Sequence, residues 1–380
     1  MAENPLLKLT ELGQSIWYDN LHREMLRSGE LARMVDEDGL KGVTSNPTIF
    51  DKAISGGTEY RTALEELIAT HPDWSAREYF YALATEDIRA AADVLRTVYE
   101  ATGGQDGFVS LEVSPDLAHQ TEESIAEAHR LFAAVDRPNV LIKIPATREG
   151  LPAIERLIAD GVSVNVTLLF SVERYVEVAQ AYLRGLQERR RRGQPLRGVV
   201  SVASFFVSRV DTLLDQLLEA RARETEAADQ ERLLALRGKL AVANAKLAFL
   251  RFRELFGGSE FGALAAEGAN VQRLLWASTG TKNPDYSDVL YLETLIGPNT
   301  INTVPPATYK AFKDHGRVSL TLEQELDTAP ALLEEAVQRG VDVPAAMRQL
   351  EEEGVSAFAK SFESLLRHIE EKVREIRDAA

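Results

Sequence analysis

Short β-rich runs alternate with longer stretches of helical periodicity through most of this chain, and this alternation limits the folds that it can form. A strand, a helix and a second strand predict a parallel pair of strands, because each helical stretch is long enough for a right-handed crossover. No Gly/Ser-rich or Pro-rich linker separates the units. Eight strands are expected, at residues 15–20, 42–46, 108–114, 140–146, 163–168, 199–206, 273–279 and 300–305.

Eight such units within roughly 300 residues favour an α/β fold that closes into a (β/α)8 TIM barrel; an open doubly wound parallel sheet is the alternative. We expect one barrel domain over residues 1–380. The stretch 211–257 is longer than one crossover needs, so it predicts a helical insertion after the sixth strand. Residues 311–380 are expected to form a helical C-terminal extension packed on the barrel, with an amphipathic helix over 355–376.

The composition excludes several classes of protein. The chain has 380 residues and no cysteine, which excludes disulfides, thiolate metal sites and a cysteine nucleophile. A net charge of −16 argues against general nucleic-acid binding, and the basic run 189–192 is interpreted as a solvated helix end. No apolar run approaches the roughly 20 residues that span a bilayer, and no signal-like start is present. We therefore expect a cytoplasmic protein with neither membrane nor nucleic-acid partners.

Side chains alternate between the two faces of a strand, so the letters of a strand show which residues share a face. In three expected strands an aliphatic face opposes a more polar one, and the aliphatic face is expected to pack beneath the outer helices. The aliphatic sets are Val109, Leu111 and Val113; Val140, Ile142 and Ile144; and Val162, Val164, Val166 and Leu168. The sets that point to the barrel axis are Ser110, Glu112 and Ser114; Leu141, Lys143 and Pro145; and Ser163, Asn165 and Thr167.

A lysine and a glutamate that point into a barrel need an explanation. Barrel interiors are usually filled by bulky aliphatic side chains, and a buried charge costs several kcal/mol unless it is paired. One explanation is a structural ion pair between Lys143 and Glu112 that fixes the strand register. The other is an active site, because catalytic groups in such barrels lie at the carboxyl ends of the strands.

Two further polar residues end predicted strands. Asp19 ends the first strand, and Asn46 ends the second on the face that also carries Thr44. These positions make all three residues candidates for a site at the carboxyl ends of the strands. Each strand-end residue also has a structural interpretation: Asp19 precedes a helical run and could cap it, and Asn46 precedes Pro47, which suits a turn and cap.

A lysine inside a partly desolvated barrel, among hydroxyls and carboxylates, suits imine chemistry with a ketose. The imine is an electron sink, so the carbon–carbon bond beside it breaks when a base removes a proton from the neighbouring hydroxyl. Asp19 and Glu112 are the candidate bases, and Thr167 could hold the water that imine hydrolysis requires. The histidines lack metal-ligand spacing and no phosphate-binding glycine loop is present, so neither a metal nor a nucleotide cofactor is expected.

Small residues, hydroxyls and cations follow the sixth and seventh strands, a pattern typical of a phosphate site in a barrel. The sixth strand passes through Ser204 and leads to Arg209, and the seventh leads through Ser278 to Lys282. For Arg209 the alternative is a surface salt bridge with Asp211 or Asp215. These cations are therefore candidates to bind the phosphate of a sugar substrate.

Several segments resemble the transaldolase family, in the family's order over residues 10–310. They include Ile16-Trp17-Tyr18-Asp19 and Glu112, and the residues from 276 to 284 with 300 to 306 are similar to the longer bacterial members. The longest matching segments are Gly42-Val43-Thr44-Ser45-Asn46-Pro47-Thr48, Leu141-Ile142-Lys143-Ile144-Pro145-Ala146-Thr147, Asn165-Val166-Thr167-Leu168-Leu169-Phe170-Ser171 and Ser204-Phe205-Phe206-Val207-Ser208-Arg209.

The resemblance implies a barrel of the class I aldolase type that needs no cofactor. Such an enzyme moves a dihydroxyacetone unit from fructose 6-phosphate or sedoheptulose 7-phosphate to erythrose 4-phosphate or glyceraldehyde 3-phosphate, in the non-oxidative pentose phosphate pathway. The resemblance assigns imine formation to Lys143, acid/base catalysis to Asp19 and the catalytic water to Glu112 with Thr167. It assigns substrate binding to Thr44, Asn46, Asn165, Ser204 and Arg209.

The resemblance leaves the second phosphate ligand undecided. Shorter members of the family have a second arginine after the seventh strand, where this chain has Ser278 and Lys282. Lys282 is the candidate replacement, although an ammonium lacks the bidentate fork of a guanidinium. The expected partners are sugar phosphates, and the chain is expected to be a monomer or a homodimer.

Two other functions are alternatives to transfer. A lyase on the same barrel would release free dihydroxyacetone if water reached the intermediate. A regulatory protein would bind the sugar phosphate without turning it over, and the presence of Lys143, Asp19, Glu112 and Thr167 argues against that function.

Overall fold

Eight parallel strands close into a barrel in the computed structural model of the chain, which describes residues 4–379. The strands are neighbours in chain order, and the first also pairs with the eighth, so the sheet has no free edge. The prediction of a (β/α)8 barrel is confirmed and the open sheet is wrong. The strands are β1 (Gln14–Tyr18), β2 (Gly42–Val43), β3 (Phe108–Glu112), β4 (Val140–Pro145), β5 (Val164–Leu169), β6 (Ser201–Phe206), β7 (Arg273–Ala277) and β8 (Thr300–Val304).

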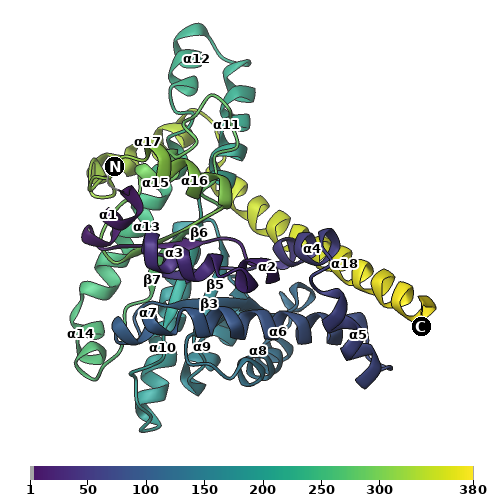
Figure 1. Ribbon diagram of the computed structural model, residues 1–380. Coiled ribbons are helices and arrows are strands. Elements are labelled where there is room, and N and C mark those ends of the chain that lie inside the picture. The colour runs from purple at the N-terminus through teal and green to yellow at the C-terminus, as the bar shows by residue number, and fades with distance from the viewer. Residues whose placement is uncertain (1–3, 380) are drawn as a thin grey trace.

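Helices surround the barrel and connect its strands (Figure 1). Within residues 4–379 every helix is too short or too polar to cross a bilayer. The helices are α1 (Pro5–Glu11), α2 (Arg23–Arg27), α3 (Glu30–Asp38), α4 (Pro47–Gly56), α5 (Arg61–Thr70), α6 (Ala76–Val94), α7 (Arg96–Ala101), α8 (Thr121–Val135), α9 (Gly150–Asp160), α10 (Val172–Arg191), α11 (Ser208–Ala222), α12 (Ala227–Leu234), α13 (Leu240–Gly257), α14 (Ser259–Ala266), α15 (Leu290–Glu293), α16 (Pro306–His315), α17 (Ala329–Gln338) and α18 (Val343–Ala379), with 3-10 turns η1 (Pro115–Leu117) and η2 (Leu326–Thr328).

Local sequence explains where several helices begin. Ser75 caps α6 in a capping box with Glu78, and the Ser171 hydroxyl accepts a hydrogen bond from the first turn of α10. These caps satisfy backbone N–H groups that a helix start leaves unpaired. Asn46 caps α4, and Pro47 supplies its first residue, so β2 ends after two residues rather than at residue 46 as predicted.

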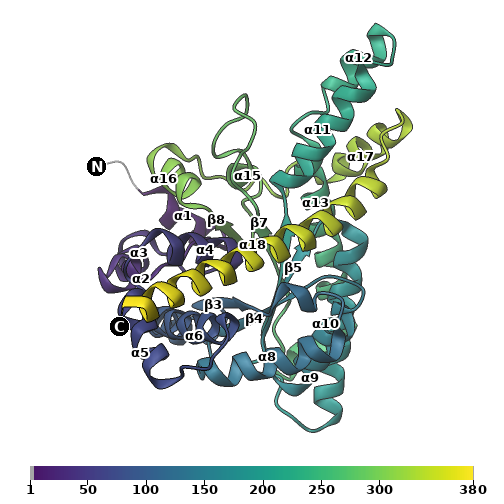
Figure 2. The same ribbon diagram turned by 90° about the vertical axis from the view of Figure 1, so that its right-hand side faces the viewer.

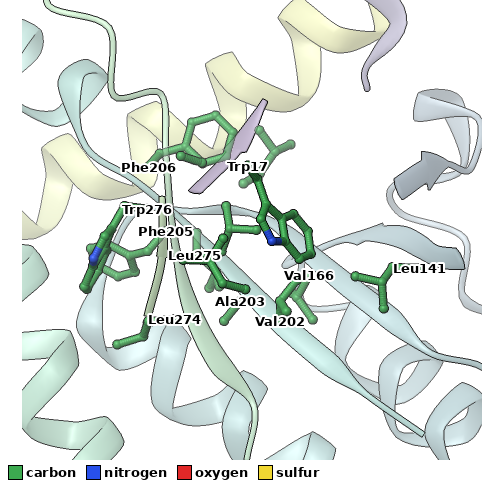
Figure 3. Close-up of a cluster of buried hydrophobic side chains, with 14 of the residues drawn as sticks. Trp17, Leu141, Val166, Val202, Ala203, Phe205, Phe206, Leu274, Leu275 and Trp276 are labelled. Carbon is green, nitrogen blue, oxygen red and sulfur yellow. The ribbon is translucent and has the colours of Figure 1, made fainter. Parts of the chain in front are cut away.

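The lower barrel interior is filled by Trp17. Its indole Nε1 donates a hydrogen bond to Asp106 Oδ1 over 2.8 Å, and Asp106 also pairs with Arg273 at 3.3 Å. Gly42 is the register partner of Trp17 on β2, and the missing side chain leaves room for the ring. Figure 3 shows Leu275 on the same side of β7 as Trp17. The bottom of the barrel is therefore closed by packing, and the polar groups described below lie above it.

The fifth strand departs from the predicted alternation at its carboxyl end. The register with β6 shifts between Val166 and Leu169, and Leu168 has a φ of 61°. Leu168 borders a small void beside Glu112 and Phe358 instead of packing beneath the outer helices, so its predicted outward placement is wrong. A bulge changes the side-chain alternation at one residue, and the sequence pattern does not report it.

Helices α11 to α14 lie between β6 and β7, and Figure 1 shows α11 and α12 projecting away from the barrel. The last helix, α18, starts at residue 343 rather than at 355 as predicted. Gly354 interrupts the helical spacing of apolar residues in the sequence. It is buried, and an added Cβ would lie 3.0 Å from Leu168 Cδ2. Figure 2 shows α18 running across one end of the barrel.

We predict that Gly42→Ala destabilises the fold. The new Cβ would lie 2.4 Å from the Trp17 ring in a closed interior, so the free energy of unfolding should fall by about 1–3 kcal/mol, as for other overpacked cores. Urea denaturation followed by circular dichroism measures the change. The matched control is Gly262→Ala on α14, where a Cβ meets nothing within 4 Å; it should raise stability by about 0.5–1 kcal/mol. A Gly42→Ala protein as stable as the wild type would contradict this account of Trp17 packing.

Candidate active site

A cavity of about 300 Å³ opens at the carboxyl ends of the barrel strands. This is the end at which (β/α)8 barrels carry their active sites. Nine of the eleven residues that the sequence singled out line it: Asp19, Thr44, Asn46, Lys143, Thr167, Ser204, Arg209, Ser278 and Lys282. Glu112 and Asn165 are buried beside it and are not among its lining residues.

Lys143 is the central cation of this cavity. It lies on β4, its side chain is 6% exposed, and its Nζ donates hydrogen bonds to Glu112 Oε2 at 3.1 Å and to the carbonyl of Ser45 at 3.0 Å. The ion pair considered from the sequence therefore exists, and Glu112 and Lys143 are register partners on β3 and β4. The amine also faces the cavity, so Lys143 is both paired inside the barrel and accessible as a nucleophile.

Apart from its ion pair with Lys143, Glu112 has aromatic side chains on two sides. It borders two voids of about 10 Å³ each, whose walls include Phe362 on one side and Phe358 on the other. Burial raises the pKa of Glu112, and the charge of Lys143 opposes that rise. A carboxyl group in this position is suited to accept and return protons above the ordinary range of a glutamate.

Asp19 follows β1 directly, and its N–H donates to the Val304 carbonyl. Its Oδ1 accepts a hydrogen bond from Thr44 Oγ1 at 2.7 Å. Burial raises the pKa of the Asp19 carboxyl, while Thr44 and the charges of Lys143, Arg209 and Lys282 oppose the rise. The helix-cap interpretation of Asp19 is wrong.

The residue that caps α2 is His22, whose Nδ1 accepts the N–H of Met25. Asp19 is therefore free of a capping role and lies in the cavity wall. Asn46 serves both roles considered from the sequence: its Oδ1 accepts the Ile49 N–H at 3.0 Å, and it also lines the cavity. The cap fixes the orientation of the amide, which leaves its NH2 group available.

A chain of hydrogen bonds fixes the polar groups beside Lys143. Asn165 Nδ2 donates to Ser110 Oγ at 3.0 Å, and its Oδ1 accepts from Ser204 Oγ at 2.7 Å. Thr167, two residues along β5, has a buried hydroxyl without a hydrogen-bond partner among residues 4–379. The unpaired hydroxyl can bind a water or a substrate hydroxyl.

Arg209 and Lys282 supply positive charge on the β6 and β7 side of the cavity. The Arg209 guanidinium lies 5.5 Å from the Phe206 ring and 6.0 Å from the Phe358 ring, and burial lowers its pKa. The surface salt bridge with Asp211 or Asp215 is wrong, because both carboxylates bind other groups. Ser278 has a φ of 54° and its hydroxyl lies 2.9 Å from Ser208 Oγ.

Two buried carboxylates on α11 anchor the segment that carries Lys282. Asp211 accepts the Ala241 N–H at 2.8 Å and the Tyr291 hydroxyl at 2.9 Å. Asp215 accepts the Tyr286 hydroxyl at 2.6 Å. Tyr286 lies in the loop between β7 and α15, and Tyr291 lies on α15, so α11 holds that loop at the cavity.

Nine cavity residues were not singled out from the sequence: Thr48, Ile49, Lys52, Phe206, Ala277, Gly280, Thr303, Pro305 and Phe358. Phe206 and Thr303 lie on strands, and Phe206 shares its face with Ser204, so strand alternation was a usable signal. Lys52 lies where the cavity meets a neighbouring one of about 520 Å³. Phe358 comes from α18, and no local pattern connects it to the barrel.

The ionisable groups at the centre of the site are one amine and two carboxyl groups, which suits catalysis by a lysine with acid/base help. No group of three or more His, Cys, Asp or Glu side chains within residues 4–379 is arranged to hold a metal ion. A buried amine between two carboxyl groups with raised pKa values, with separate cations for an anion, defines a lysine-centred barrel site.

Comparison with known proteins identifies the family. Residues 16–369 match the model of the family described as Transaldolase/Fructose-6-phosphate aldolase, so the chain belongs to this family. It is 45% identical over 379 residues to a protein named transaldolase from Trichodesmium erythraeum, covering 99% of both chains. It is 48% identical over 368 residues to a transaldolase from Mycolicibacterium smegmatis, covering 96% of this chain and 97% of that protein.

We predict a pH-dependent stability that arises from Asp211. Burial raises the pKa of Asp211 from 3.8 to about 7, so the folded state binds a proton that the unfolded state releases. Between these values stability falls as pH rises, by up to about 1.4 kcal/mol per pH unit. Asp211→Asn keeps an acceptor for Ala241 and should flatten this dependence.

Urea unfolding at about pH 5, 6 and 7, which lie between the ordinary and the raised pKa of Asp211, measures the change in the free energy of unfolding. The matched control is Tyr291→Phe, which removes the phenol but keeps the carboxyl, and it should retain the pH dependence. An Asp211→Asn protein with the wild-type slope would assign the dependence to another group.

Proposed function

We propose that this chain is a transaldolase in which Lys143 forms an imine with the ketose donor. One observation carries the proposal: Lys143 is buried in a cavity with Asp19 in its wall, and Glu112 lies 3.1 Å from the amine. The names of the nearly full-length relatives support the same reaction. The substrates would be sugar phosphates, because the cavity also holds Arg209 and Lys282.

In the first step Lys143 Nζ, in its neutral form, attacks the ketose carbonyl carbon and a carbinolamine forms. Loss of water from the carbinolamine gives a protonated imine, and each proton transfer needs an adjacent acid or base. Glu112 lies beside the amine and Thr167 has an unpaired hydroxyl, so together they can hold the water that leaves and later returns. The protons remain within this group of side chains.

In the second step Asp19 removes the proton from the hydroxyl next to the bond that breaks. The electron pair of that carbon–carbon bond moves into the imine, an enamine remains on Lys143, and an aldose phosphate leaves. Transfer to a second aldehyde reverses these events, with Asp19 returning the proton to the new hydroxyl. A raised Asp19 pKa suits a residue that must both take and give a proton.

Borohydride trapping tests the proposal. After incubation with fructose 6-phosphate and borohydride, the wild type should gain the mass of a reduced three-carbon adduct, mapped to Lys143 by peptide analysis. Lys143→Ala should gain no adduct, since the amine is gone. Asp19→Asn should accumulate a six-carbon adduct, because the imine forms but the bond is not cleaved.

The dependence of turnover on an acceptor aldehyde distinguishes transfer from release. Turnover that depends on erythrose 4-phosphate identifies transfer, and equal turnover with no acceptor identifies a lyase that releases dihydroxyacetone. A wild-type protein that binds fructose 6-phosphate but forms no adduct would refute the enzyme and favour a binding protein.

We predict that Arg209 recognises the substrate phosphate. Arg209→Gln removes the charge but keeps polar bulk, so KM for fructose 6-phosphate should rise on the order of 10- to 100-fold. Steady-state kinetics with unphosphorylated fructose as donor provide the control, since that sugar has no phosphate to lose. Equal losses with both donors would instead place Arg209 at the reacting carbons.

A further inference from the structure

The C-terminal helix α18 passes over the mouth of the barrel (Figure 2). It also contributes a side chain to the cavity. The following inference rests on the proposed function, because it concerns the fate of an intermediate on Lys143. Phe358 on α18 is 7% exposed and lines the same cavity as Lys143 and Asp19. Its ring centre lies 5.7 Å from Lys143 Nζ and 6.0 Å from Arg209 Cζ.

Contacts on both sides of Phe358 hold this part of α18 in place. Gly354 lies one turn before it, and its lack of a side chain lets the helix approach Leu168. After it, Ser361 Oγ accepts a hydrogen bond from Thr48 at 2.9 Å, and His368 Nδ1 lies 2.6 Å from Asp51 Oδ1. Thr48 and Asp51 belong to α4, so the helix that Asn46 caps also positions α18 over the cavity.

Phe358 borders two spaces with different chemistry. On one side lies the 300 Å³ cavity with Lys143, and on the other lies a void of about 10 Å³ bordered by Glu112, Pro145 and Leu168. The volume of this void is at the lower limit of what one water molecule needs. Phe358 lines both spaces, so shortening its side chain would join them and bring more water between Glu112 and the imine.

We propose that Phe358 determines reaction specificity by keeping water away from the carbon attached to Lys143. The enamine left after cleavage has two fates. In transfer, its carbon forms a bond to the acceptor aldehyde. In release, the enamine carbon takes up the proton that Asp19 gained during cleavage and an iminium ion forms. Water then adds to the iminium carbon, Glu112 accepts a proton from it and returns one to the nitrogen, and the carbon–nitrogen bond breaks to give dihydroxyacetone and the free amine.

Only the second fate consumes a water molecule before the acceptor reacts, so a barrier to water beyond the one that Glu112 and Thr167 can hold favours transfer. Glu112 lies 3.1 Å from the lysine nitrogen and can accept the proton of that water. The aromatic face near Nζ also favours a positive charge there, which suits the protonated imine formed before cleavage. Phe358 thus shields the intermediate without offering a proton donor or acceptor of its own.

The test compares Phe358→Ala, Phe358→Leu and Leu365→Ala in the full-length protein. Leu365 is fully buried on the same helix and does not line the cavity, so its truncation weakens packing without opening the site. For each protein, dihydroxyacetone release from fructose 6-phosphate without acceptor is measured with an NADH-coupled reductase. Transfer to erythrose 4-phosphate and the borohydride adduct on Lys143 are measured alongside.

Phe358→Ala should raise the ratio of release to transfer by about tenfold or more, and Phe358→Leu should restore most of the wild-type ratio through its apolar bulk. Leu365→Ala should leave the ratio unchanged. An unchanged ratio in Phe358→Ala, with the Lys143 adduct still formed, overturns the role of Phe358 and leaves the proposed function intact. If Leu365→Ala raises the ratio as much as Phe358→Ala, loosening of α18 explains the effect and the role of Phe358 is also overturned. Absence of the adduct in the wild type refutes the proposed function itself.

Discussion

The buried ion pair between Lys143 and Glu112 is the constraint on which the site depends. Two charges in a barrel interior each carry a desolvation penalty of several kcal/mol, and removing one partner leaves the other uncompensated. The adjacent strands β3 and β4 place the two residues as register partners, and the Ser45 carbonyl supplies a second acceptor for the amine. A barrel without a use for this amine would be better filled by aliphatic side chains.

Around this pair the structure assigns different physical tasks to different elements. Strands β1 and β2 bring Asp19 and Thr44 together, and β5 with β6 fixes Asn165 through Ser204. Helix α11 acts on the site indirectly, because Asp215 binds a tyrosine within the Lys282 loop and Asp211 binds a tyrosine on the helix that follows it. Rigid strands thus position the reacting groups, while anchored loops and α18 determine what else can enter.

Strand alternation predicted the inward direction of the polar residues because it is a local property with a period of two. It failed at Leu168, where a bulge with positive φ turns the side chain toward Phe358. It also placed Glu112 on the inward face without indicating that Phe358 and Phe362 would enclose it. Alternation predicts on which face of a strand a side chain lies, and it does not predict which distant segment packs over that face.

The sequence by itself determined the eightfold strand and helix order, the inward lysine and the strand-end carboxylate, since each follows from periodicity within a few residues. Tertiary structure decided that Asp19 accepts from Thr44 rather than capping a helix, that Arg209 faces aromatic rings rather than Asp211, and that Phe358 covers the amine. These outcomes depend on contacts between segments far apart in the chain. Their geometry is set only when the barrel closes and α18 packs across its mouth.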